Sequence, residues 1–91
     1  MEIELIRAEK DLLEFKIKGE RHTYPQLLKY YLLKNPDVAF AAYKLEHPLD
    51  KDSIFIVKVK KGTPLQALKD ANKEIIAEID DFAEKLKEAL K

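Results

Sequence analysis

Residues 62–91 read GTPLQALKDANKEIIAEIDDFAEKLKEALK, with one proline near the start and no glycine after the first position. Thr63, followed by Pro64 and Gln66, is typical of a helix N-terminus, because the threonine can accept a backbone hydrogen bond and the proline needs no partner in the first turn. Apolar residues then recur every three or four positions, which predicts one long amphipathic helix. The apolar stripe consists of Leu65, Leu68, Ile75, Ile79, Phe82, Leu86 and Ala89, widened by Ile76, Ala83 and Leu90.

The predicted helix is too long for the strands that could support it. About 28 helical residues span roughly 42 Å, whereas a seven-residue strand covers roughly 24 Å. The stripe nevertheless continues through Ile79, Phe82, Leu86 and Leu90. Burying four such side chains stabilises a complex by about 6–12 kcal/mol. Because association itself costs about 4–15 kcal/mol, a stable complex needs further buried surface. We predict that this half of the helix is buried against a second polypeptide; the alternative is that it frays or folds back on the sheet edge.

Two pairs of strands precede the long helix. Residues 2–7 and 12–18 alternate between apolar and charged side chains, as in half-buried strands joined in a hairpin. Residues 53–60 predict another strand with one apolar face. Residues 38–46 are apolar on both faces, which favours a strand that is central in the sheet or covered on both sides.

A shorter helix separates the two pairs of strands. Thr23 with Gln26 three residues later predicts a capping box at its start, and Asn35-Pro36 predicts its end. Its expected buried face consists of Tyr24, Leu27, Leu28, Tyr31 and Leu32. The order ββαββα predicts an α+β, two-layer sandwich: a four-stranded antiparallel sheet with two helices on one face and a long C-terminal helix. We expect residues 1–91 to form a single domain, because 91 residues do not hold two cores.

Composition argues against several classes of function. The chain has 17 Lys and Arg against 17 Asp and Glu, interleaved along the sequence, so we expect no direct specific nucleic-acid binding. It has no cysteine, which excludes disulfides and thiolate chemistry. Its start lacks the blocks of a signal peptide, and its longest apolar run, residues 38–43, is too short to cross a membrane. We expect a cytoplasmic protein without membrane association.

The sequence contains no recognisable combination of residues for catalysis, cofactor binding or metal binding. We therefore expect no catalytic, cofactor-binding or metal-binding residues in this chain. His22 and His47 each lie at a turn and lack metal-ligand spacing. Gly19 and Gly62 alone cannot form a phosphate-binding loop. A small enzyme of related fold, such as a pterin dehydratase, would need a cluster of histidines on the sheet face, and two widely separated histidines do not supply it.

Both helices contribute to the predicted partner interface. Tyr30 and Leu33 lie beside the core-facing stripe of the shorter helix and extend its apolar arc, and Ile54 and Ile56 add outward apolar groups on the sheet. Asn72 falls within the long stripe, where it either sets the register between paired helices or faces solvent. The expected interface residues are Tyr30, Leu33, Ile75, Ile79, Phe82, Leu86 and Leu90.

Several short motifs, taken together, resemble one known family. They are His22-Thr23, Leu27-Leu28, the segment NPDVAFAAY at residues 35–43, and His47-Pro48-Leu49. Their spacing is similar to that of archaeal RNA polymerase subunit L, its eukaryotic counterparts and, more distantly, the dimerisation domain of the bacterial α subunit. The motif residues are His22, Thr23, Leu27, Leu28, Val38, Phe40, Ala41, Tyr43, His47, Pro48 and Leu49.

One stretch departs from the family pattern. Tyr24-Pro25-Gln26 stands where the family usually carries Leu-Gly-Asn or a close relative, which puts in doubt any partner contact made through that asparagine.

The resemblance implies a non-catalytic subunit of RNA polymerase. In the family, the L subunit pairs with the D subunit through helices packed across a pseudo-twofold axis. This heterodimer seeds assembly of the two large catalytic subunits and joins the other small subunits, and nucleotidyl transfer takes place on a metal held by the largest subunit. A free-standing homodimeric binding module of the same fold is the alternative.

Overall fold

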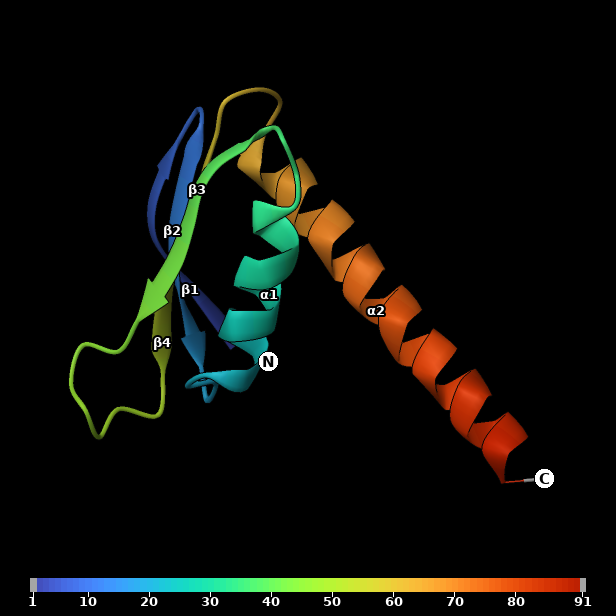
Figure 1. The fold of residues 1–91 in the computed structure, drawn as a ribbon. Helices are drawn as coiled ribbons and strands as arrows, with labels where there is room; N and C mark the ends of the chain where they lie inside the picture. Colours follow the sequence, from blue (N-terminus) through green and yellow to red (C-terminus); the bar gives the residue numbers. More distant parts are fainter. Residues whose placement is uncertain (1, 91) are drawn as a thin grey trace.

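Four strands form one antiparallel sheet in the spatial order β1-β2-β4-β3, and both helices lie on one side of it (Figure 1). The computed structural model describes residues 2–90. Its elements are β1 (Glu2–Glu9), β2 (Leu12–Lys18), α1 (Thr23–Leu33), β3 (Val38–Lys44), β4 (Ser53–Val59) and α2 (Pro64–Ala89). The predicted α+β fold, with its ββαββα order and long closing helix, is confirmed.

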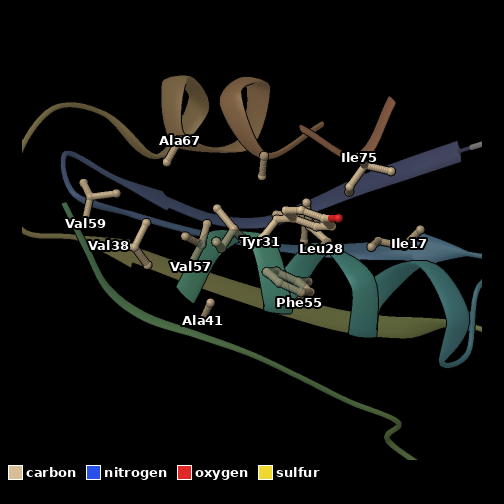
Figure 2. Packing of buried hydrophobic residues seen from close by; sticks show 13 residues of the cluster. Ile17, Leu28, Tyr31, Val38, Ala41, Phe55, Val57, Val59, Ala67 and Ile75 are labelled. Carbon is tan, nitrogen blue, oxygen red and sulfur yellow. The ribbon is translucent and has the colours of Figure 1, made fainter. Parts of the chain in front are cut away.

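The hydrophobic core lies between the sheet and the helices (Figure 2). Phe15 of β2 and Phe55 of β4 stack at its centre, with their ring centroids 5.6 Å apart. From α1, Leu28 and Leu32 are almost completely buried against them. The cluster also contains Ile17, Tyr31, Val38, Ala41, Val57, Val59, Ala67, Ala71 and Ile75. The predicted inner face of the fourth strand is therefore confirmed.

Strand β3 lies at an edge of the sheet, so the prediction of a central position is wrong. β4 takes the centre because it pairs with β2 on one side and β3 on the other. A register shift between Val38 and Phe40 marks a β-bulge, which turns Val38 and Ala41 toward the core while Phe40 faces away. The outer face of β3 is apolar without being covered by the described chain, since Phe40 is 49% exposed.

Helix α1 begins at Thr23, so the cap position falls on His22, which makes no side-chain cap hydrogen bond. Its third helical residue is Pro25, which has no N–H to offer such a cap. The capping box predicted for Thr23 is therefore wrong. The prediction that Leu27 is buried is also wrong: this side chain is 37% exposed and is turned toward α2 rather than toward the sheet.

Helix α2 packs on the rest of the chain only through its first half. Thr63 Oγ1 accepts a hydrogen bond from the Gln66 N–H at 3.2 Å, as the sequence predicts. The last buried residue of α2 is Ile75, and every residue from 76 to 90 is exposed. At 1.5 Å per residue these positions span roughly 20 Å. Figure 1 shows this end of α2 extending away from the sheet. The alternative in which this part folds back on the sheet edge is wrong.

Candidate partner interface

The projecting part of α2 carries a row of exposed apolar side chains. Ile79 is 58% exposed, Phe82 67% and Leu86 49%, and Leu90 continues the row at the end of the helix. Residues three and four apart lie on the same side of a helix, so these side chains form one continuous ridge. Soluble chains rarely leave an apolar ridge of this length uncovered, and such surfaces mark sites of protein association.

The ridge begins well before α2 leaves the sheet. Leu65 and Ile76 are exposed as fully as Ile79, although this part of the helix packs on the core through Ala67 and Ile75. Consecutive residues point about 100° apart, so Leu65 and Ile76 lie beside the core-facing side of α2, whereas Phe82 and Leu86 continue that side beyond the sheet. We call the exposed apolar side chains of α2, which are Leu65, Ile76, Ile79, Phe82, Leu86 and Leu90, the α2 ridge.

Ile75 lies on the same side of α2 as Ile79, Phe82 and Leu86, but this chain's own fold covers most of it. Its side chain is only 6% exposed and lies in the core cluster. Ile76, which the sequence pattern places at the margin of the stripe, occupies the exposed position instead. The place of Ile75 in the partner interface stays a prediction, because its side chain also lines the hollow between α1 and α2.

A hollow of about 180 Å³ lies between α1 and the projecting half of α2. Leu27 and Tyr31 of α1 form one wall. The α2 wall consists of Ile75, Glu78, Ile79 and Phe82. Leu27 is part of the family motif, and its exposure is explained if this hollow receives a partner side chain. The hollow extends the α2 ridge onto α1.

A second hollow, of about 360 Å³, lies between β1 and the start of α2. The helices do not cover β1, so Ile3 and Leu5 are 54% and 61% exposed although their cross-strand neighbours on β2 are buried. Its lining is almost entirely apolar and comprises Ile3, Leu5, Leu13, Phe15, Tyr24, Leu28, Leu65, Leu68 and Asn72. Because Leu65 also belongs to the α2 ridge, the two surfaces are continuous.

The contribution of β1 to this surface is not apparent from the sequence. The alternation of Ile3 and Leu5 with charged residues predicts a half-buried strand whose apolar side faces the core. The same alternation is also consistent with a strand whose apolar face is left exposed for contact with another chain. Only the position of the helices over the sheet shows whether that face is covered or exposed.

Tyr24 and Asn72 are joined at the edge of this second hollow. The Tyr24 hydroxyl donates to Asn72 Oδ1 at 2.5 Å, and Asn72 Nδ2 donates to the Leu68 carbonyl at 3.0 Å. Both side-chain hydrogen bonds of Asn72 are therefore within its own chain, and the residue is partly buried. This differs from the two predicted roles, which were to set the register between paired helices or to face solvent. Tyr24, which departs from the family pattern, supplies the group that satisfies Asn72.

Replacing Tyr24 with phenylalanine is expected to lower the free energy of unfolding by about 1 kcal/mol, because it leaves Asn72 Oδ1 without a donor. The double variant Tyr24→Phe with Asn72→Leu removes both polar partners and should recover most of that loss. Urea unfolding followed by circular dichroism measures both. Equal losses in the single and double variants would show that the hydrogen bond contributes nothing.

Stability is also expected to fall at alkaline pH. Burial raises the pKa of Tyr24 above its ordinary value of 10.0, and the nearby Glu20 acts in the same direction, while the hydrogen bond to Asn72 opposes it. The folded state therefore keeps the Tyr24 proton at a pH where the unfolded chain has lost it, so stability decreases as the pH rises above 10.0. Unfolding curves between about pH 8 and about pH 11 should show a smaller decrease for Tyr24→Phe than for the parent chain; identical curves would exclude this contribution.

On α1, Tyr30 and Leu33 are 57% and 53% exposed, as expected of interface residues. Lys34 Nζ lies 4.6 Å from the centroid of the Tyr30 ring and 5.0 Å from that of Tyr31. The hydrogen bond to Tyr30 is the largest influence raising the pKa of Lys34, so the cation persists beside the ring. An exposed cation–ring contact of this kind contributes about 0.5–1 kcal/mol.

The remaining motif residues fix the start of α1 against the sheet. His22 Nδ1 and the Tyr43 hydroxyl lie 3.1 Å apart, which links α1 to β3. Arg21 donates to the Pro48 carbonyl at 2.8 Å, and the His47 N–H donates to Asp50 Oδ2 at 2.9 Å within its own turn. Structural roles thus account for most of these motif residues, whereas Leu49 is 91% exposed and nothing in the described chain explains it.

Neither a metal-binding cluster nor a membrane-spanning helix is found within residues 2–90. No group of three or more His, Cys, Asp or Glu side chains in that range is placed to hold a metal ion. No helix in the same range combines the length and apolarity required to cross a bilayer.

Comparison with known proteins gives consistent results. The sequence profile of the RNA polymerase Rpb3/Rpb11 dimerisation domain matches residues 12–85. The DNA-directed RNA polymerase subunit Rpo11 of Archaeoglobus fulgidus is 40% identical over 86 residues, which cover 94% of this chain and all of the relative. The Rpo11 subunit of Pyrococcus abyssi is also 40% identical, over 94 aligned positions that cover 100% of this chain and 99% of the relative.

A solved structure agrees in fold. The crystal structure of DNA-directed RNA polymerase subunit L from Thermoplasma acidophilum superposes with a TM-score of 0.85. The match covers 96% of this chain and 86% of that one, at 24% sequence identity.

Proposed function

The chain belongs to the RNA polymerase Rpb3/Rpb11 dimerisation domain family, the family of the archaeal subunit Rpo11 or L, and on that premise we propose that it is a small, non-catalytic subunit of a DNA-directed RNA polymerase. The observation that carries the proposal is the α2 ridge, an apolar surface that the chain's own fold leaves uncovered. Such a subunit acts by assembly, so it needs a surface for another chain rather than a reactive group. Because the relatives are archaeal subunits, its place is the cytoplasm.

The partner is the Rpb3-like subunit of the same enzyme, which is the D subunit of the archaeal polymerase. Its own helices pack against the α2 ridge across a pseudo-twofold axis. The hollow beside Leu27 and the hollow beneath β1 flank the ridge and supply sockets for partner side chains. The interface comprises Tyr30, Leu33, Ile75, Ile79, Phe82, Leu86 and Leu90 from the sequence prediction, with Ile3, Leu5, Leu27, Leu65 and Ile76 added from the structure.

The size of this surface supports an obligate association. A stable interface usually buries about 800 Å² on each partner, so we expect exposed apolar side chains of α1 and β1 to join those of α2 in it. Apolar residues dominate the set, as in obligate dimers, and the charged residues of α2 lie beside the ridge. Two of these charged residues, Asp81 and Lys85, are exposed and form an ion pair at 3.0 Å.

Co-expression with a homologue of the D subunit tests the proposal. Analytical ultracentrifugation should show a 1:1 heterodimer, whereas this chain alone should self-associate weakly or aggregate. A stable, symmetric homodimer that does not exchange with the D subunit would instead favour the free-standing binding module. A stable monomer with no affinity for the D subunit would overturn both.

The heterodimer is in turn the platform for the two large catalytic subunits and the other small subunits. Reconstitution with these subunits should yield an active polymerase only when this chain is present. Activity of the same strength without it would contradict the assembly role.

A further inference from the structure

The hollow between α1 and the projecting half of α2 adjoins a second hollow of different chemistry. The first, of about 180 Å³, is lined mainly by apolar and aromatic side chains. The second, of about 230 Å³, is lined by Tyr31, Lys34, Glu74, Ala77, Glu78 and Asp81. Tyr31 and Glu78 line both hollows. We call the two together the interhelical groove, which is apolar at one end and acidic at the other.

Negative charge exceeds positive charge at the acidic end of the interhelical groove. The carboxylates that line this end are Glu74, Glu78 and Asp81. Asp81 forms an ion pair with Lys85 at 3.0 Å. No ion pair of Glu74 or Glu78 is found among residues 2–90. Within the same range Lys34 is the only cation that lines the groove. Three carboxylates thus have two lysines beside them, which leaves one negative charge unmatched.

The pKa of Tyr31, whose ring lies between the two hollows, reflects the same excess of negative charge. Burial is the largest cause that raises this pKa above its ordinary value of 10.0, and Glu78 raises it further. Lys34 lowers the pKa of Tyr31, but by less than Glu78 raises it. The electrostatic potential at the middle of the groove therefore favours a positive charge.

The carboxylates alone would not indicate a binding site, because exposed acidic side chains are common on helices. The apolar end of the groove gives an independent indication, since Ile79 and Phe82 are exposed there and belong to the α2 ridge. A metal ion does not fit, because no three His, Cys, Asp or Glu side chains within residues 2–90 are placed to hold one. A side chain with an apolar stem and a positive end fits both ends of the groove.

We propose that an arginine side chain of the D subunit occupies the interhelical groove, with its stem at the apolar end and its guanidinium beside Glu74 and Glu78. This inference rests on the proposed function and deepens it, because it names the kind of side chain that positions the partner. A guanidinium stacks on aromatic rings and donates to carboxylates through a rigid fork of N–H groups. A lysine would supply only a point charge, and an apolar side chain would leave the two carboxylates partly desolvated without a partner.

A second copy of this chain has no free arginine to offer. Its only arginines are Arg7 and Arg21. Arg7 Nε lies 3.7 Å from Glu14 Oε1, on the sheet face opposite the helices. Arg21 donates to the Pro48 carbonyl at 2.8 Å. Neither arginine belongs to a helix, and neither lies on the α2 ridge. The occupant of the groove therefore comes from a different chain, which agrees with a heterodimer.

Replacing Glu74 and Glu78 with glutamine removes two charges but keeps the shape of both side chains. We expect the double variant Glu74→Gln/Glu78→Gln to bind the D subunit about tenfold more weakly than the parent chain, with slower association. The matched control Asp80→Asn/Glu84→Gln removes the same charge from the side of α2 that faces away from the groove. This control should bind like the parent chain.

Surface plasmon resonance with the immobilised D subunit measures both the affinity and the association rate. All four substituted positions are exposed, so circular dichroism of the two double variants should match that of the parent chain. Equal affinities of the two double variants, with tight binding by the parent chain, would overturn the arginine proposal and leave the proposed function intact. A parent chain that does not bind the D subunit would overturn both.

A double-mutant cycle identifies the arginine. Each arginine on the helices of the D subunit is replaced in turn with methionine, which keeps much of the apolar stem. One replacement should weaken binding to the parent chain about tenfold but weaken binding to Glu74→Gln/Glu78→Gln by less than about twofold, because the interaction is already absent there. Lysine at that position should not restore the parent affinity. Coupling only to a lysine of the D subunit, or to no basic residue, would contradict the proposal.

Discussion

Phe82→Asp is expected to weaken binding to the D subunit by at least about 100-fold, which corresponds to about 2.7 kcal/mol. Phe82 is 67% exposed in the isolated chain and stands near the middle of the projecting half of α2. A central aromatic residue of an apolar interface often accounts for a large share of its binding energy. The substitution removes this contact. It also places a charged carboxylate in the apolar interface, where the carboxylate would have to lose its hydration.

Lys73→Asp is the matched control for this prediction. It introduces the same residue on the exposed surface of the same helix, but at a position that points away from the α2 ridge. Isothermal titration calorimetry with the purified D subunit should therefore give nearly the parent affinity for Lys73→Asp. Similar affinities for Phe82→Asp and the parent chain would place the interface elsewhere and remove the main support for the proposed function.

Phe55→Ala is expected to lower the free energy of unfolding by about 3–5 kcal/mol, the range for deletion of a fully buried aromatic side chain. Phe55 has no exposed surface and stacks on Phe15 at the centre of the core. Because a domain of this size is stable by only about 5–15 kcal/mol, the variant should be close to unfolding at the growth temperature of a mesophile.

Phe40→Ala is the control for the core variant. It deletes the same side chain from the neighbouring part of the sheet, but Phe40 is 49% exposed and lies on the outer face. Its expected cost is less than about half of that for Phe55→Ala, since less apolar area leaves a buried environment. Urea unfolding of the two heterodimers measures the difference, and equal losses would mean that Phe40 is as buried as Phe55.

The elements were largely predictable because each has a strong local signal. Thr63 with Pro64 and Gln66 predicted the start of α2, and the structure shows the expected cap. The mismatch between helix and strand lengths predicted that part of α2 would project, because helix rise and strand rise are fixed by backbone geometry. These inferences use only neighbouring residues, so they did not depend on the tertiary arrangement.

The errors concern facts that neighbouring residues do not determine. The apolar run in β3 indicated a central strand, but strand order is set by which strands pair, and β4 pairs with both β2 and β3. The sequence does not show which residues of the α2 stripe the chain's own fold covers, so it did not predict that Ile75 is buried while Ile76 stays exposed. The hollow beneath β1 could not be foreseen, because it depends on where the helices lie over the sheet.

The projecting half of α2 also has a consequence for the chain before assembly. A copy made in excess of its partner exposes Ile79, Phe82, Leu86 and Leu90 to water along a single ridge. Orphan copies should therefore be targets for chaperones and proteases, which act on exposed apolar surface. Since partner binding stabilises the folded chain by mass action, the cellular abundance of this subunit should follow the supply of the other half of the dimer.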